Sequence, residues 1–332
     1  MPLGINFHYK NYISVKVLKL LVMFMITTVV GSYPVVKKEE TFLDKVKKAF
    51  GLYDEYKYAI ERAVKDQVKA GIDIISDGQV RGDMVEIFTN NMYGFDGKRV
   101  VGRVEFIKPI TLKDILYAKS VAKKLNPNVE VKGIITGPCT IASSVRVESY
   151  YSDNRDENLI YDIAKALRRE IEAIKNHVPI IQIDEPILST GLYDFEVAKK
   201  AIDIIVEGLN ITFAMHVCGD VHNIIDELNR FNVDILDHEF ASNRKNLNIL
   251  ESIEKKVGFG CINTKVKKVE SVEEIKSLIE EGIEILKNNE KLNKNLSENI
   301  LIDPDCGMRL LPIDVAFNKL KNMVEASKLI KI

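Results

Sequence analysis

Four side chains of types that bind soft metal ions lie near the ends of apolar runs in the second half of the sequence. His216 and Cys218 are two positions apart, so in a strand both would point to the same face. Glu239 ends the next apolar run, and Cys306 lies in the DPDCG segment that ends the last one. Two thiolates, an imidazole and a carboxylate form a ligand set that suits Zn²⁺, whereas sulfur ligands disfavour Mg²⁺ and Ca²⁺. These four residues could therefore form a zinc site.

The same residues allow a second interpretation. Free cysteines are often small buried apolar side chains, and this spacing does not match a CxxC finger. Cys139 and Cys261 also lie near the ends of predicted strands and could serve as ligands instead. His238 is next to Glu239 but should point to the opposite face of its strand. The spacing alone leaves a metal site and buried thiols as alternatives.

Eight short apolar runs alternate with amphipathic segments along the chain. Continuous apolar runs suit parallel strands that are covered on both faces, and their alternation with helical patterns indicates βαβ units. Eight units predict an α/β fold of the (β/α)8 TIM-barrel type, whose active site lies at the C-terminal ends of the strands. The predicted strands are residues 27–34, 72–78, 131–138, 178–186, 211–219, 233–240, 256–263 and 300–307. The predicted helices are residues 54–70, 111–125, 155–176, 195–208, 221–230, 246–255, 271–290 and 312–329.

Two segments need a separate interpretation. Residues 79–110 form a long excursion after the second strand, in which RVVGRVEFI (99–107) predicts a small inserted hairpin. Residues 1–24 are interpreted as an N-terminal extension or a misassigned start, which leaves residues 25–332 as a single catalytic barrel. Residues 15–30 also resemble a signal peptide, but the run is short and interrupted by lysines, so no membrane span is expected.

The composition argues against two classes of protein. The 332-residue chain has 47 Lys and Arg against 48 Asp and Glu, whereas a general nucleic-acid-binding protein would show a basic excess. Its four scattered cysteines are too few for a disulfide-linked secreted scaffold. We therefore expect a cytoplasmic protein without nucleic-acid or membrane partners.

Seven segments resemble, in order, the catalytic C-terminal half of cobalamin-independent methionine synthase. They are GSYP, DGQVRGDMVEIF, TGPCTIASS, IQIDEPILSTGL, HVCGD, DHEFASNR and DPDCGMR, and they span residues 27–311. The resemblance implies a zinc-dependent methyltransferase that transfers a methyl group to the zinc-activated thiolate of homocysteine and forms methionine. The family's zinc-ligand positions fall here on His216, Cys218, Glu239 and Cys306.

The resemblance also implies which residues bind homocysteine. Asp184, in QIDEP, matches the aspartate that binds the ammonium group, although a structural carboxylate at a strand end is the alternative. Gly31 and Ser32 match the backbone segment that holds the substrate carboxylate, and Met84 matches a residue beside the substrate. Gln79 stands where the family has a second ammonium-binding glutamate, so a charge is lost while a hydrogen-bond acceptor remains.

Three departures from the family pattern concern the methyl donor. The chain lacks the duplicated N-terminal half, and it contains no Trp that could stack on a pterin. Lys265 and Asn263 occupy the positions of the family's catalytic histidine and its preceding aspartate. A folate nitrogen must be protonated when it leaves, whereas a cob(I)alamin leaving group needs no proton. We therefore expect methylcobalamin or a corrinoid methyl-donor protein as the donor.

Three other functions stay open from the sequence. A methylcobalamin:coenzyme M methyltransferase would share the barrel and the His-x-Cys motif, but the IDEP motif and the acidic residue after HVCGD argue against it. A folate-dependent homocysteine methyltransferase would need Lys265 as an acid, with its pKa lowered by burial. A zinc-binding regulatory or corrinoid-docking protein would lack turnover, yet no candidate ligand is missing.

Overall fold

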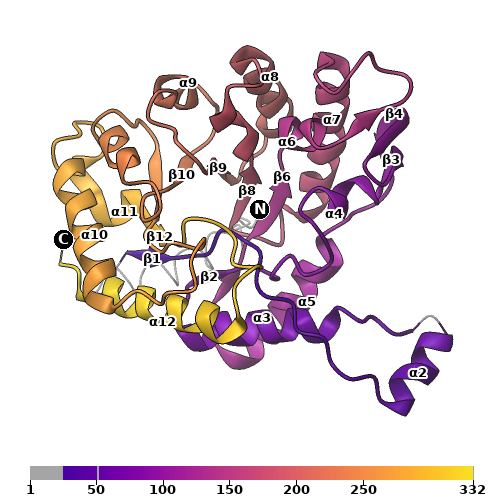
Figure 1. Ribbon diagram of the computed structural model, residues 1–332, viewed down its shortest axis with the longest axis horizontal. Coiled ribbons are helices and arrows are strands. Elements are labelled where there is room, and N and C mark those ends of the chain that lie inside the picture. Colours follow the sequence, from indigo (N-terminus) through magenta and orange to yellow (C-terminus); the bar gives the residue numbers. More distant parts are fainter. Residues whose placement is uncertain (1–24, 51, 332) are drawn as a thin grey trace, which may run out of the picture.

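The computed structural model describes residues 25–50 and 52–331, and it shows an α/β fold with a curled parallel sheet inside and helices outside (Figure 1). The predicted N-terminal extension, residues 1–24, lies outside the described residues. Within the described part of the chain, no helix has both the length and the apolar character that a membrane span requires.

The main sheet has seven strands, all of them parallel to their neighbours. A shorter ladder joins β2 (Ile74–Ile75) to β5 (Glu130–Val131), and a single bridge between Thr28 and Ile74 connects it to the first strand. The described residues therefore show two parallel ladders joined by one bridge, and not a single closed ladder of eight strands as the predicted barrel would have. The strands of the main sheet, in order, are β1 (Ile26–Thr27), β12 (Ile300–Asp303), β11 (Lys256–Gly260), β10 (Ile235–Glu239), β9 (Thr212–His216), β8 (Ile180–Asp184) and β6 (Gly133–Thr136).

The strands are shorter than the apolar runs predicted. The first run, 27–34, contributes only β1 and the bridge at Thr28, and the last run, 300–307, ends as a strand at Asp303. In both runs the C-terminal part forms a loop, because its backbone groups bond across the mouth of the sheet. For example, the Met308 N–H donates to Ser32 O at 2.8 Å.

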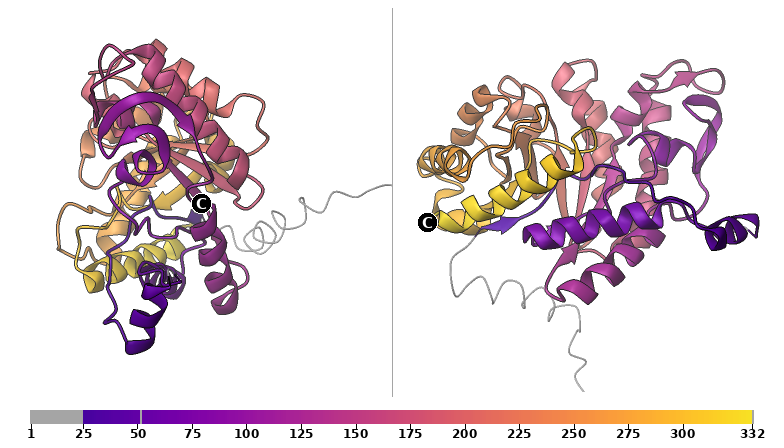
Figure 2. Two further views of the ribbon diagram at one scale, coloured as in Figure 1. Left: turned by 90° about the vertical axis from the view of Figure 1, so that its right-hand side faces the viewer. Right: turned by 60° about the horizontal axis from the view of Figure 1, so that its bottom comes forward.

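The long helices cover the outside of the sheet, and α3 and α12, the first and last of them, lie side by side (Figure 2). Each buries an apolar stripe, as the amphipathic pattern predicts. Two predicted helices differ: residues 246–255 contain a 3-10 helix, η2 (Arg244–Glu251), and 221–230 contain only the short α9 (Ile225–Asn229). The long helices are α3 (Lys57–Ala70), α5 (Leu112–Leu125), α7 (Glu157–Ile174), α8 (Phe195–Val206), α10 (Val272–Leu286) and α12 (Ile313–Leu329).

The excursion after β2 contains an antiparallel pair, β3 (Met92–Asp96) with β4 (Arg99–Phe106). The segment 99–107 therefore supplies one strand of this pair, rather than a whole hairpin. Residues 92–96 supply the other strand, and β7 (Arg146–Val147) joins β4 in parallel. The short helices are α4 (Glu86–Thr89), α6 (Pro138–Ser143), η1 (Pro186–Thr190), η3 (Asn293–Asn295) and α11 (Leu296–Asn299).

The sequence did not predict an eight-residue helix near the start of the described chain. The helix α2 (Phe42–Ala49) follows β1 and stands away from the rest of the molecule (Figures 1 and 2). It is held locally by a capping box, in which Thr41 and Asp44 satisfy each other's backbone N–H groups. None of its residues is buried, and Phe42 is 80% exposed.

The apolar core has two parts. The larger part lies between the sheet and the helices, whereas a small cluster from five strands lies inside the curl, formed by Ile74, Ile180, Ala214, Ile235 and Leu301. Since side chains alternate along a strand, the next residues on the same face point into the curl above this cluster. They are polar: Gln182, Asp184, His216, Asp237, Glu239 and Asp303.

Candidate metal and substrate site

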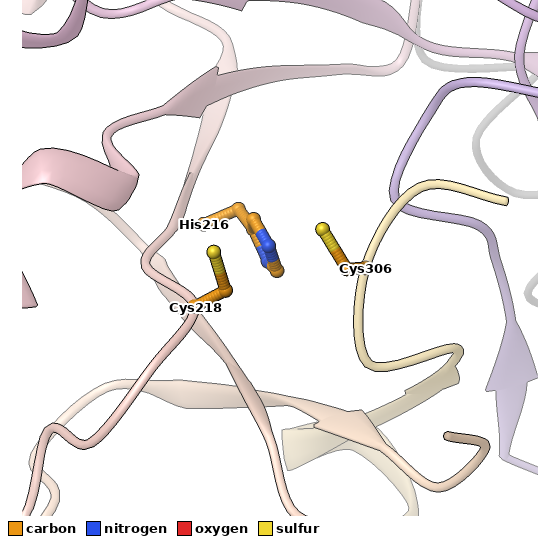
Figure 3. Close-up of side chains that lie close together, drawn as sticks. All are labelled: His216, Cys218 and Cys306. Atoms are coloured by element: carbon orange, nitrogen blue, oxygen red, sulfur yellow. The ribbon is translucent and has the colours of Figure 1, made fainter. Parts of the chain in front are cut away.

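Three of the four predicted metal ligands meet at the C-terminal ends of the strands. His216 ends β9, Cys218 follows it by two residues, and Cys306 lies in the loop after β12 (Figure 3). The ligand atoms of these three side chains all lie within 4.8 Å of one another. Since β10 and β11 separate β9 from β12 in the sheet, the curl of the sheet is what brings the two thiols together.

The electrostatics of this cluster suit a cation. Neither ring nitrogen of His216 has an aligned hydrogen-bond partner, although Nδ1 lies 3.2 Å from Oδ1 of the buried Asp237. Burial alone would lower the pKa of His216, but the charge of Asp237 holds that pKa well above its usual value. A hydrogen bond from the Cys306 thiol lowers the pKa of Cys218. The cluster therefore combines a thiol whose pKa is lowered with a histidine in a negatively charged surrounding, whose ring nitrogens make no aligned hydrogen bond.

The fourth predicted ligand, Glu239, ends β10 but is not part of the three-residue group. Its Oε1 accepts a hydrogen bond from Lys265 Nζ at 2.9 Å, and its buried Oε2 has no partner among the described residues. Asn263 fixes the backbone at this lysine, because Asn263 Oδ1 accepts from the backbone N–H of Lys265 at 2.8 Å. The assignment of Glu239 as a metal ligand stays a prediction.

The alternative cysteine ligands do not join the cluster. Cys139 and Cys261 are both buried, and burial raises the pKa of each thiol well above its usual value. His238 lies on the other face of β10, where its Nδ1 is 2.9 Å from the Val217 carbonyl oxygen. In the described residues, the group that could hold a metal ion is His216, Cys218 and Cys306.

Asp184, the predicted ammonium-binding residue, ends β8 directly beside His216 in the β8–β9 register. It is only 4% exposed, and burial raises its pKa to about 6 although His216 and Gln182 favour the ionised form. Asp184 and the cluster of His216, Cys218 and Cys306 therefore belong to one site.

The other predicted substrate residues lie on two neighbouring loops, which follow β1 and β2. Gly31 approaches Gln79 so closely that a Cβ at Gly31 would lie 2.6 Å from Gln79 Oε1. Gln79 has a left-handed backbone, with φ at 45°. Ser32 adjoins Gly307, the residue after Cys306, where a Cβ would lie 2.2 Å from Ser32 Oγ. The Met84 carbonyl accepts from Thr136 Oγ1 at 2.8 Å. These loops border the side of the site that holds Cys306.

A cavity of about 510 Å³ lies on the β2 side of the sheet. Gln79 and Lys132 line it together with Arg81, but His216, Cys218 and Cys306 do not. Arg81 is already paired with Asp54 and Asp114.

The sequence did not reveal the charged layer beneath the site. Lys132, Gln182, Asp237 and Asp303 are all buried there. A glycine makes room for it, because a Cβ at Gly258 of β11 would lie 2.6 Å from the Asp237 Cβ. The signal that could have found Gln182 and Asp237 is their position two residues before Asp184 and Glu239 on the same strands.

The chain is similar to proteins of known family across almost its whole length. A family model described as "Cobalamin-independent synthase, Catalytic domain" matches residues 25–329. A protein named methionine synthase from Methanocaldococcus jannaschii is 92% identical over 308 residues, which cover 93% of this chain and 100% of the relative. A methionine synthase from Methanothermobacter marburgensis is 45% identical over 317 residues, covering 91% of this chain and 99% of the relative.

Solved structures agree on the fold. A B12-independent methionine synthase from Shewanella sp. W3-18-1 in complex with selenomethionine has a TM-score of 0.76 at 22% identity, covering 92% of this chain and 97% of that chain. A methyltransferase from Methanosarcina mazei has a TM-score of 0.62 at 16% identity, covering 92% and 93%. The chain therefore belongs to the cobalamin-independent methionine synthase family and is a methyltransferase.

Proposed function

We propose that the protein forms methionine by methylating the thiolate of homocysteine at a zinc ion held by His216, Cys218 and Cys306. The observation that carries this proposal is the meeting of one imidazole and two thiols within 4.8 Å, with no aligned hydrogen-bond partner at either ring nitrogen. Sulfur and imidazole ligands suit zinc, and three protein ligands leave a position for a substrate atom, as in catalytic zinc sites.

The residues around the substrate thiol have separate proposed roles. A bound Zn²⁺ supplies thiol activation, because a free alkyl thiol with a pKa of ~8.5 is deprotonated when it coordinates a metal. His216, Cys218 and Cys306 hold the ion. Glu239 is the proposed fourth ligand in the absence of substrate, and Lys265 at 2.9 Å supplies a counter-charge for its carboxylate.

The ammonium and carboxylate groups of homocysteine are proposed to bind to different elements around the thiol site. Asp184 accepts the ammonium group, since it lies in register with His216 and is buried. The backbone at Gly31 and Ser32 binds the carboxylate, while Gln79 and Met84 border the substrate. The contacts between Gly31 and Gln79, and between Ser32 and the loop of Cys306, support this arrangement.

We also infer that residues 25–332 form one catalytic (β/α)8 barrel. The bridge between Thr28 and Ile74 and the hydrogen bond from Lys132 N to Ile75 O at 2.9 Å support a closed ring of strands. We place the reaction in the cytoplasm, where thiols stay reduced, since all four cysteines are free.

The methyl donor is proposed on sequence grounds. The absence of Trp and the presence of Lys265 and Asn263 in the relay positions favour a methylcorrinoid. The name of the matching family, cobalamin-independent, speaks for methyltetrahydrofolate instead. The two donors therefore have to be compared directly.

The test measures methionine formation and zinc content together. Homocysteine and coenzyme M serve as competing acceptors, each with methylcobalamin and with methyltetrahydrofolate. We expect one zinc per chain, turnover of homocysteine only, and loss of both zinc and activity in Cys218→Ser and Cys306→Ser. Cys261→Ser, which removes a buried thiol outside the cluster, is the matched control and should keep both. Full zinc in both ligand variants would disprove the metal assignment.

A further inference from the structure

We propose that Gln182, oriented by Lys132, is a positioning residue that makes the site selective for thiols bearing an amino group, because it fixes Asp184 as an acceptor. This inference rests on the proposed function, in which Asp184 binds the ammonium group of homocysteine. All three side chains are at least 95% buried.

The orientation of the Gln182 amide follows from its neighbours. Lys132 Nζ donates to Gln182 Oε1, and an ammonium group has only donors, so the oxygen of the amide must face the lysine. The amide nitrogen then donates its two hydrogens to the Val30 carbonyl at 2.7 Å and to Asp184 Oδ1 at 2.6 Å. Each hydrogen-bonding group of this amide is thereby used, and the amide has one orientation.

The consequence for Asp184 is that its two oxygens differ. Oδ1 accepts the hydrogen bond from Gln182, which lies two residues earlier on β8, and no group in the described residues donates to Oδ2. The ammonium group of a ligand would therefore meet Oδ2, on the level of His216, which pairs with Asp184 in the β8–β9 register. Without Gln182, the Asp184 carboxylate could rotate or turn down toward the Lys132 ammonium.

Lys132 has a second effect, which is electrostatic. It is buried beneath the site, and burial lowers its pKa although the charges of Asp237, Asp303 and Asp184 favour its ammonium form. By donating to Gln182, the lysine contacts Asp184 through a neutral amide. The negative charge of Asp184 thus remains available to the substrate.

The test compares two acceptors that differ only in the amino group: homocysteine and 4-mercaptobutanoate. Both have the thiol and the carboxylate, so the ratio of their kcat/KM values isolates recognition of the ammonium group. In Gln182→Met, we expect this ratio to fall by roughly tenfold or more, through a higher KM for homocysteine. The rate with 4-mercaptobutanoate and the zinc content should be unchanged.

Two further variants separate positioning from a structural role. Gln182→Asn keeps an amide but is one methylene shorter, so it cannot reach Lys132 and Asp184 together, and the same fall in the ratio is expected even if Gln182→Met does not fold. Gln67→Met removes another fully buried glutamine, one that bonds Ser76 and Ala63, and should leave the ratio unchanged.

The outcomes are distinct. An unchanged ratio in Gln182→Asn, or an equal loss with both acceptors, would overturn the positioning role of Gln182 while leaving the proposed function intact. A wild-type protein that binds zinc but does not methylate homocysteine would instead refute the proposed function itself.

Discussion

Lys265 and Glu239 form an ion pair across the mouth of the sheet, with 2.9 Å between Nζ and Oε1. The carboxylate side chain is 2% exposed and the lysine side chain is 58% exposed, so a solvent-exposed cation neutralises a buried anion. The pair joins the loop after β11 to the last residue of β10, next to the cluster of His216, Cys218 and Cys306.

This pair predicts a specific effect of Lys265→Met. The variant removes the counter-charge for Glu239, so the carboxylate should leave a bound zinc ion less easily when homocysteine arrives. We expect the KM for homocysteine to rise about three- to tenfold, a modest effect because the lysine is largely exposed. Zinc affinity should be equal or higher. Steady-state kinetics and zinc titration measure both, and Lys265→Arg should restore the KM.

Asp237 is expected to orient His216 for metal binding. A carboxylate that accepts the second ring N–H of a metal-ligating histidine typically contributes 10- to 100-fold to metal affinity. Asp237→Asn should therefore weaken zinc binding by about that factor, measured by competition with a chromophoric chelator. Asp234→Asn is the matched control, because Asp234 caps the Phe213 N–H near the start of β10. Equal zinc affinity in both variants would contradict the role of Asp237.

Asp184→Asn is expected to impair homocysteine use and to leave zinc content unchanged. A charge-assisted hydrogen bond contributes about 1.5–3 kcal/mol, which corresponds to a roughly 10- to 150-fold loss in kcat/KM. Kinetics with homocysteine and elemental analysis of the same preparation test this. An unfolded variant would instead indicate that Asp184 is a structural carboxylate.

Glu185 predicts a pH dependence of stability. Burial raises its pKa to about 7, even though the N–H groups of Cys139 and Thr140 donate to its carboxylate. A folded-state pKa above the unfolded value of about 4.5 means that the folded chain binds more protons between these two pH values. The free energy of unfolding should therefore fall as pH rises from about 4.5 to 7, by about 3 kcal/mol from this residue.

The comparison for Glu185 is a denaturation series across this pH range in wild type and Glu185→Gln. The variant cannot titrate at this position, so its curve should be flatter by the contribution of Glu185. Parallel curves would show that the carboxylate is ionised throughout.

The sequence predicted the strands and the placement of His216 beside Cys218 because both follow from local patterns. The apolar runs mark buried strands, and the two-residue spacing of His216 and Cys218 places both on one face. The meeting of Cys306 with these two requires the curl of the sheet, and it was expected only because eight βα units imply a barrel. The family resemblance supplied the choice among the four cysteines.

Other features depend on tertiary contacts that no local pattern records. The pairing of Lys265 with Glu239 joins two loops, and the orientation of Gln182 depends on Lys132 from a different strand. The helix α2 was missed for the opposite reason: none of its residues is buried by the described part of the chain, so only its capping box marks it. The strand ends were placed too late, since backbone bonds between loops replaced the ladder after β1 and β12.

The glycines of β11 limit how this protein can change during evolution. A Cβ at Gly258 would lie 2.6 Å from Asp237, and a Cβ at Gly260 would lie 2.7 Å from the His238 carbonyl oxygen and 2.8 Å from Asp305. No side chain can be gained at either position without displacing the acidic residues around the thiols. In a library of random substitutions, both positions should tolerate almost no replacement, so new specificities would have to arise on the neighbouring strands and loops.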